Sequence, residues 1–392
     1  MFGGVPQSEL DALEEFWKAF PGLRSALFTD NGTPYVQPKV DDLAEAIREH
    51  ADVQGFTQQF SAAFADFNPW LRGELIDQMS EVSIQRQEPL IGEAIFQRLE
   101  PIPLIDKYHA YQLLDNEWQQ IAIDLEILQT EGFEAAKVVD PNMVTKKKKG
   151  KDVEEQEGWK GHVLPFDLVQ RLHHKDELAA LQEKENRLTE IDASFEDTLE
   201  SLSEEEKEAE TVHESGDKWV NAVVKKEAKQ LKAEARERQG ASRRSSSSNE
   251  PAASASPLTD PESYEAKIIQ VGDWLAEESK LNKAIKKDAA ALHNKTKDTI
   301  ENLSDDQVNE LLEAKWILPL GESLHELPER QIEKLTEKVQ ALVEKYQTTN
   351  ADNAREIQQT ETELSGMIGQ LEGNEFDMKG LAELTTFLGG GD

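Results

Sequence analysis

The chain has 392 residues and a formal net charge of −35, with 38% hydrophobic and 31% charged residues. This composition favours helices that bury one apolar stripe over a thick α/β core, and the lack of cysteine excludes disulfides, thiol nucleophiles and cysteine-ligated zinc. No stretch approaches the ~18 consecutive apolar residues of a membrane span, and the N-terminus lacks a signal-peptide pattern. We therefore expect a cytoplasmic protein.

The spacing of apolar residues predicts a mainly α-helical protein, a helical bundle with long coiled-coil-like helices. Residues 1–132 are expected to form a helical region, because apolar side chains recur there every three or four residues. Residues 133–166 depart from this pattern, since two short apolar pieces flank a charged turn that contains glycine. Such a pattern is typical of a small loop or hairpin excursion.

The second half of the chain is expected to consist of two helical parts and a linker. Residues 167–239 contain no proline and predict one long coiled-coil-like helix. Residues 240–262 are rich in Ser, Ala and Pro and are interpreted as a flexible linker. Residues 263–388 predict a C-terminal helical assembly region. Two apolar stripes in it flank the polar residues 348–353, which predicts an antiparallel helix pair.

Several apolar residues on these helices are candidates for packing against a partner helix, because a helix pair alone buries little surface. They are Leu178, Leu181, Leu188, Leu335, Val339, Leu342, Leu364 and Leu371.

Two basic segments stand out in this acidic chain and could contact phosphate groups. The first is a run of five lysines in the predicted excursion: Lys146, Lys147, Lys148, Lys149 and Lys151. The alternative is a solvated turn that nearby glutamates, Glu154, Glu155 and Glu157, neutralise. The second is residues 218–244, with nine Lys or Arg against three Glu. It could lie on a phosphate backbone or an acidic partner, or it could be a solvated helix end.

The sequence offers no constellation of residues able to perform chemistry. It lacks a glycine-rich phosphate loop, and its histidines do not have metal-ligand spacing. The segment Gly321-Glu322-Ser323-Leu324-His325 nearly matches a nucleophile elbow but lacks the final glycine. We assign no catalytic, cofactor-binding or metal-binding residue.

Peptide stretches along nearly the whole chain resemble the modification subunits of type I DNA restriction–modification systems. They include residues 2–6 (FGGVP), 102–108 (IPLIDKY), 140–144 (DPNMV), 161–166 (GHVLPF) and 371–377 (LEGNEFD). The resemblance implies an S-adenosylmethionine-dependent adenine N6-methyltransferase. In this family two modification subunits join one specificity subunit, with or without a restriction subunit, and the specificity subunit reads the DNA. The C-terminal helices of the family pack on helical parts of the specificity subunit.

The chain departs from this family at the catalytic motifs. Methyl transfer there uses a glycine-containing cofactor motif and an Asn-Pro-Pro-Tyr/Phe motif that holds the flipped adenine, whereas Asn68-Pro69-Trp70 lacks the second proline. We therefore expect a C-terminal part of a modification subunit that binds no cofactor itself and acts in assembly and, through the complex, on DNA. The alternatives are one half of a split, complementing methyltransferase, and an acidic helical scaffold or DNA mimic.

Overall fold

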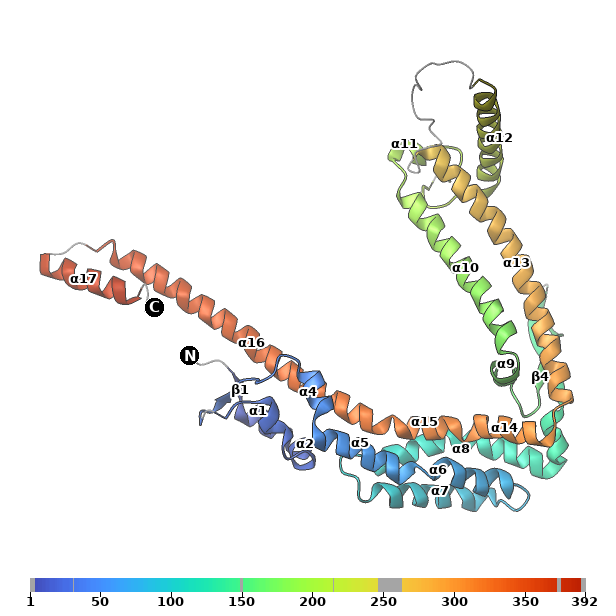
Figure 1. The fold of residues 1–392 in the computed structure, drawn as a ribbon, viewed down its shortest axis with the longest axis horizontal. Helices are drawn as coiled ribbons and strands as arrows, with labels where there is room; N and C mark the ends of the chain where they lie inside the picture. The colour runs from blue at the N-terminus through green and yellow to red at the C-terminus, as the bar shows by residue number, and fades with distance from the viewer. Residues whose placement is uncertain are drawn as a thin grey trace. The chain divides into compact units, whose positions relative to one another are not determined.

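The computed structural model of the chain describes residues 4–30, 32–148, 151–213, 215–245, 263–371 and 375–388. Helices make up 74% of it and strands 8%, which confirms the prediction of a mainly α-helical protein (Figure 1). The chain folds as two compact units. Unit 1 comprises Met1–Thr130 and Leu312–Asp392, and unit 2 comprises Glu131–Leu311.

Unit 1 combines the N-terminal helices with the last helices of the chain. Its two-stranded antiparallel sheet pairs β1 (Val5–Pro6) with β2 (Tyr35–Val36). Its N-terminal helices are α1 (Gln7–Asp11), α2 (Glu14–Ala19), α3 (Leu23–Leu27), α4 (Leu43–Glu49), α5 (Ala51–Phe64), α6 (Phe67–Arg72), the π-helical turn Gly73–Asp77, α7 (Ile84–Leu99) and α8 (Lys107–Glu131). Its C-terminal helices are the end of α14 (Asp305–Trp316), α15 (Leu318–His325), α16 (Leu327–Ile368) and α17 (Glu375–Leu388).

Aromatic side chains and the first half of α16 form the core of unit 1. Phe60 and Phe64, one turn apart on α5, stack with their ring centroids 4.6 Å apart. The first half of α16 packs on α4 and α5, and Leu335 and Val339 are fully buried there. Nearer the middle of α16, the Tyr346 hydroxyl donates a 2.9 Å hydrogen bond to Glu9 on α1. The N-terminal helices thus need the C-terminal helix to complete their core.

A buried charged group joins α8 to α14 inside unit 1. Asp124 is buried, with its side chain 3% exposed, and its Oδ2 accepts a 2.8 Å hydrogen bond from the Trp316 indole. The same oxygen accepts a bond from the Lys315 ammonium, whose side chain is 12% exposed. Gln120 donates to Oδ1 at 3.0 Å. A buried carboxylate is tolerated only when it is paired in this way.

Unit 2 contains the predicted hairpin and three long helices. Its elements are the 3-10 turn Phe133–Lys137, β3 (Val139–Lys148), β4 (Lys151–Gly161), α9 (Phe166–His173), α10 (Lys175–Glu200), α11 (Glu204–Lys207), α12 (Asn221–Ser245), α13 (Tyr264–Glu301) and the start of α14. Strands β3 and β4 pair antiparallel with an irregularity between Pro141 and Met143. At the root of the hairpin, the Trp159 N–H donates to His293 Nε2 on α13 at 2.9 Å.

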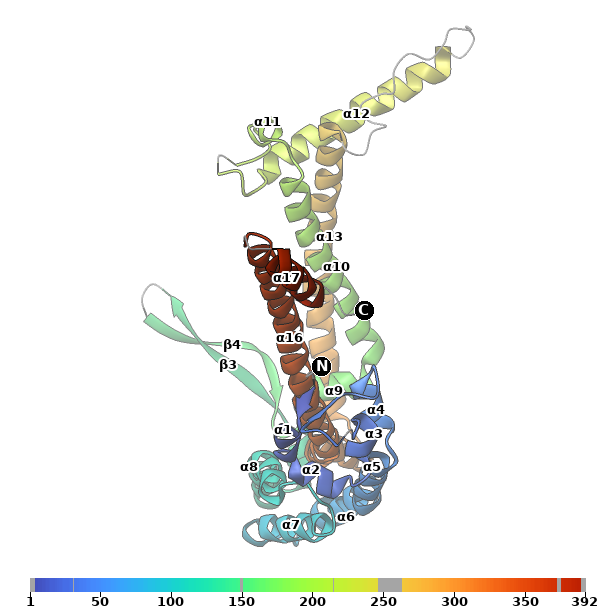
Figure 2. The same ribbon diagram turned by 90° about the vertical axis from the view of Figure 1, so that its left-hand side faces the viewer.

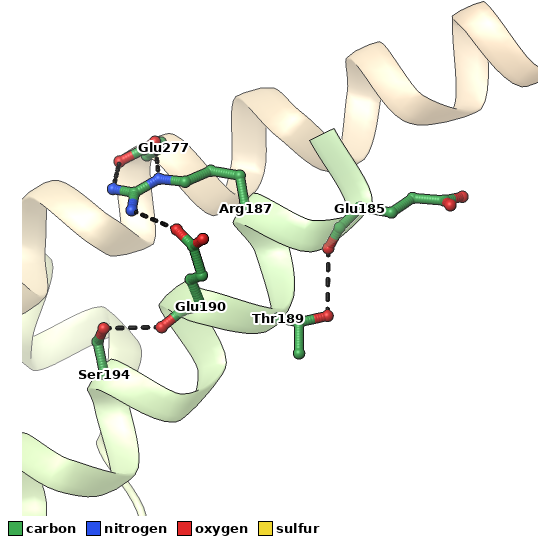
Figure 3. A network of polar contacts seen from close by, with 6 residues as sticks. All are labelled: Glu185, Arg187, Thr189, Glu190, Ser194 and Glu277. Carbon is green, nitrogen blue, oxygen red and sulfur yellow. Dashed lines mark hydrogen bonds and ion pairs between the residues drawn. The ribbon is translucent and has the colours of Figure 1, made fainter. Parts of the chain in front are cut away.

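Helices α10 and α13 lie side by side and antiparallel. Three ion pairs show this, since their residue numbers increase along α10 and decrease along α13. Glu177 pairs with Lys295 and Lys184 with Asp288. Figure 3 shows the third pair, in which Arg187 Nε and Nη2 donate to both carboxylate oxygens of Glu277 at 2.8 and 3.1 Å. These side chains are about two-fifths exposed, so each pair contributes specificity more than stability.

Three details of the predicted elements differ in the structure. The single helix expected over 167–239 is interrupted: the Ser203 capping box starts α11, and Gly216 adopts a φ of +71° in the turn before α12. The antiparallel pair expected around 348–353 is instead one continuous helix, α16, since those polar residues include no glycine or proline to end it. The C-terminal region 263–388 is divided between the two units.

The predicted linker lies mostly outside the described part of the chain. Helix α12 continues to Ser245, so residues 240–245 of the expected linker are helical. Residues 246–262 are not among those that the structure describes.

Candidate functional site

The second half of α16 and the turn that follows it carry an exposed apolar stripe, which we call the docking stripe. It consists of Ile357, Leu364, Met367 and Leu371, whose side chains are 58%, 41%, 59% and 52% exposed. Ile357, Leu364 and Met367 are spaced by seven and three positions and therefore share one helix face, and Leu371 lies in the turn just after the helix. Large apolar side chains that lie together on one exposed face mark a site of interaction with another molecule.

The docking stripe is exposed because the body of unit 1 covers only the first half of α16. Leu335 and Val339 are buried by α4 and α5, whereas the described side chains from Arg355 to Met367 are exposed, apart from the half-buried Ser365. Helix α17 packs against α16, and Ile368 near the end of α16 is 7% exposed. On α17, Met378 and Leu384 are also exposed, at 41% and 46%.

The predicted packing residues on α16 and in the turn after it differ in burial. Leu335 and Val339 are enclosed within the chain, and this corrects their assignment as partner contacts, because a fully buried side chain has no surface left for a second protein. Leu342 is half-buried. Leu364 and Leu371 are exposed and belong to the docking stripe.

The predicted packing residues of α10 already have a helix beside them. Leu178, Leu181 and Leu188 are half-buried on a helix whose neighbour is α13 of the same unit. The coiled-coil-like spacing of α10 is therefore satisfied in large part by a helix from beyond the predicted linker.

The lysines of the hairpin lie among carboxylates. Lys146 Nζ is 3.0 Å from Glu157 Oε1, and Lys147 faces Asp152 across the two strands. The Lys146–Glu157 pair agrees with the neutralised turn that we considered as the alternative to phosphate binding. Lys149 lies outside the described residues, and for Lys148 and Lys151 the structure describes the backbone alone.

The surroundings of two histidines in unit 2 shift their pKa values in opposite directions. His162 Nδ1 lies 2.7 Å from Asp140 Oδ2, and this hydrogen bond, with Glu131 near Nε2, raises the pKa of His162 above its usual value. Burial lowers the pKa of His174, whose Nε2 lies 3.0 Å from the Thr299 hydroxyl. Both rings join structural elements within unit 2.

The segments that came nearest to catalytic motifs are parts of helices. Asn68 and Pro69 lie in the first turn of α6, and the near match to a nucleophile elbow, Gly321 to His325, lies inside α15. A nucleophile elbow requires a sharp turn between a strand and a helix, so this segment cannot serve as one. Among the described residues, no group of three or more His, Asp or Glu side chains is arranged to hold a metal ion.

Comparisons of the chain with protein-family models, with curated proteins and with solved structures found no match. In the part of the chain that the structure describes, every helix is too short or too polar to cross a membrane.

Proposed function

We propose that this chain is an assembly segment of a type I DNA modification methyltransferase that binds the DNA-specificity subunit through the docking stripe. Two kinds of observation support the proposal: the resemblance of peptide stretches to modification subunits, and the exposed apolar face at the end of α16. The specificity subunit would read the DNA target, and a separate catalytic part would bind S-adenosylmethionine and methylate adenine. A second modification subunit and a restriction subunit are the further partners of such an assembly.

The docking stripe can supply useful affinity. Complete burial of a Leu, Ile or Met side chain stabilises a complex by about 1.5–3 kcal/mol. The four stripe residues are about half exposed, so each would contribute about 1 kcal/mol and the stripe about 4 kcal/mol. Association also costs rotational and translational freedom, so the stripe would act together with polar contacts at its rim. Helices of the specificity subunit, with apolar stripes of their own, are the partner that fits it.

The test is co-purification of this chain with a co-expressed type I specificity subunit. Leu364→Asp with Met367→Asp should weaken the complex at least about 100-fold, because the change removes apolar contacts and places carboxylates in the interface. Gln358→Asp with Thr362→Asp adds the same charge on the opposite face of α16 and should leave the complex intact. Both pairs are exposed, so both variants should keep wild-type circular dichroism.

Two results would reject the proposal. The first is a Leu364/Met367 variant that co-purifies as well as the wild type, and the second is equal loss in the Gln358/Thr362 control. If the complex forms, adding the catalytic part and measuring adenine methylation tests whether the assembly supports modification.

A further inference from the structure

Helix α12 carries a line of cations along one face, which we call the basic stripe. It consists of Lys225, Lys229, Lys232 and Arg236, whose spacing of four, three and four residues places them above one another on a helix. At a rise of 1.5 Å per residue the basic stripe is about 16 Å long. The whole of α12 has eight Lys or Arg and three Glu, in a chain whose net charge is −35.

Packing on α13 fixes which face of α12 points to solvent. Val224 and Ala228 are buried in a cluster with Ile268 and Val271 of α13. Gly272 permits this close crossing, since a Cβ there would overlap the Cβ of Ala228. Figure 2 shows α12 crossing the end of α13 and continuing beyond it. The crossing therefore holds the neighbouring face, which carries the basic stripe, away from α13.

Most of the basic stripe is not neutralised within the chain. Lys225, Lys229 and Arg236 are exposed, and no ion pair between them and a described carboxylate is present. Lys232 at the margin of the crossing pairs with Asp273. The three cations thus form an uncompensated line of positive charge on an otherwise acidic protein.

Glu227, with Glu210 and Glu265 near it, lies on the other side of the buried face of α12. Glu227 is half-buried there, and burial together with Glu210 and Glu265 raises its pKa. Glu227 and the basic stripe therefore lie on opposite sides of the buried face of α12.

We propose that the basic stripe binds the phosphate backbone of duplex DNA. A straight row of cations suits a regular row of like charges, and the duplex backbone provides one. Helix α12 contains no aromatic residue, whereas proteins that bind single strands stack bases on aromatic rings. Lysines and arginine on phosphates position a protein without reading sequence. This role goes beyond the docking function and does not depend on it, since α12 and the docking stripe belong to different units.

The chemistry of α12 favours nucleic acid over an acidic protein as the partner. Protein interfaces place apolar or aromatic anchors at their centre. None of the large apolar side chains that the structure describes on α12 is exposed. The basic stripe therefore has no such anchor beside it.

The test is fluorescence polarisation of the full chain with a labelled duplex of mixed sequence, measured from low to physiological salt. The wild type should bind at low salt with an affinity that falls steeply as salt rises. Lys225→Glu, Lys229→Glu and Arg236→Glu together should weaken binding at least tenfold. They should also reduce the slope of log K against log salt by about 3, since each lost phosphate contact removes about 0.9.

The matched control reverses three exposed lysines on other helices, Lys175→Glu, Lys283→Glu and Lys334→Glu, and so changes the net charge equally. It should keep the wild-type slope. A neutral variant, Lys225→Gln with Lys229→Gln and Arg236→Gln, should show an intermediate loss and guards against a folding defect caused by the glutamates.

Four results would overturn the proposal: no wild-type binding at low salt, equal loss in the control, tighter binding of a single strand of the same length, or displacement of the duplex by polyglutamate at equal charge. The last result would identify an acidic protein as the partner. Co-purification with the specificity subunit is scored separately, so either proposal can fail while the other stands.

Discussion

The buried carboxylate of Asp124 gives the most direct test of how unit 1 is held together. Asp124→Asn keeps an oxygen that can accept the Trp316 N–H, but it removes the charge that neutralises the Lys315 ammonium. Removing one partner of a buried ion pair costs about 3–5 kcal/mol, because the other charge stays desolvated. We expect a loss of unfolding free energy in this range, measured by urea denaturation followed by circular dichroism.

The double variant separates charge from packing. Asp124→Asn with Lys315→Met removes both charges and retains a long apolar side chain at position 315, so it should lie within about 1–2 kcal/mol of the wild type. Hydrogen exchange of α8 and α14 should show the local opening in the single variant and its repair in the double variant. The reasoning is refuted if Asp124→Asn costs less than about 1 kcal/mol, or if the second substitution destabilises the protein further.

The remaining predictions concern two sites in unit 2, His162 and Gly272, and one glycine on α16 of unit 1. Hydrogen bonding to Asp140 raises the pKa of His162 in the folded protein. The stabilisation that His162 provides should therefore be fully present at pH values below the pKa of histidine in the unfolded chain, about 6.5. It should be lost as the pH rises through the higher pKa of His162 in the folded protein. Urea denaturation of the wild type and His162→Gln across this window should therefore differ at low pH and converge at high pH; a constant difference would contradict the pairing. Gly272→Val should cost about 1–3 kcal/mol by forcing α12 from α13, whereas Gly366→Ala, which meets no atom within 4 Å, should stabilise α16 by about 0.5–1 kcal/mol. Thermal denaturation of the two variants measures both changes in stability. A Gly272→Val variant that is no less stable than Gly366→Ala would show that α12 and α13 do not cross closely.

The helical character of the chain and the hairpin at 133–166 follow from local patterns, and both could be predicted. Apolar spacing of three and four residues sets the helices, and charged residues around a glycine set the turn. The break between α10 and α12 also had a local signal. Ser203 and Glu206 have the capping-box spacing, and Gly216 offers the positive φ that the turn uses.

The intramolecular partners of the helices could not be predicted from local patterns. Leu335 and Leu364 both lie on apolar stripes of α16, yet the first is 0% and the second 41% exposed. The difference arises from α4 and α5, which lie almost three hundred residues earlier in the chain and cover only the first half of α16. Spacing tells which face of a helix is apolar, but not whether the same polypeptide or another one covers that face.

Unit 1 is built from both ends of the chain, and this affects the order in which the two units can fold during translation. A ribosome releases the N-terminal helices long before Val339 and Tyr346, which complete their core and contact Glu9. Unit 2, by contrast, is one continuous segment and can fold as soon as α13 emerges. The N-terminal helices of unit 1 therefore leave the ribosome before unit 2 but reach their native packing after it, and in the interval their phenylalanine-rich surface is open to chaperones and to aggregation.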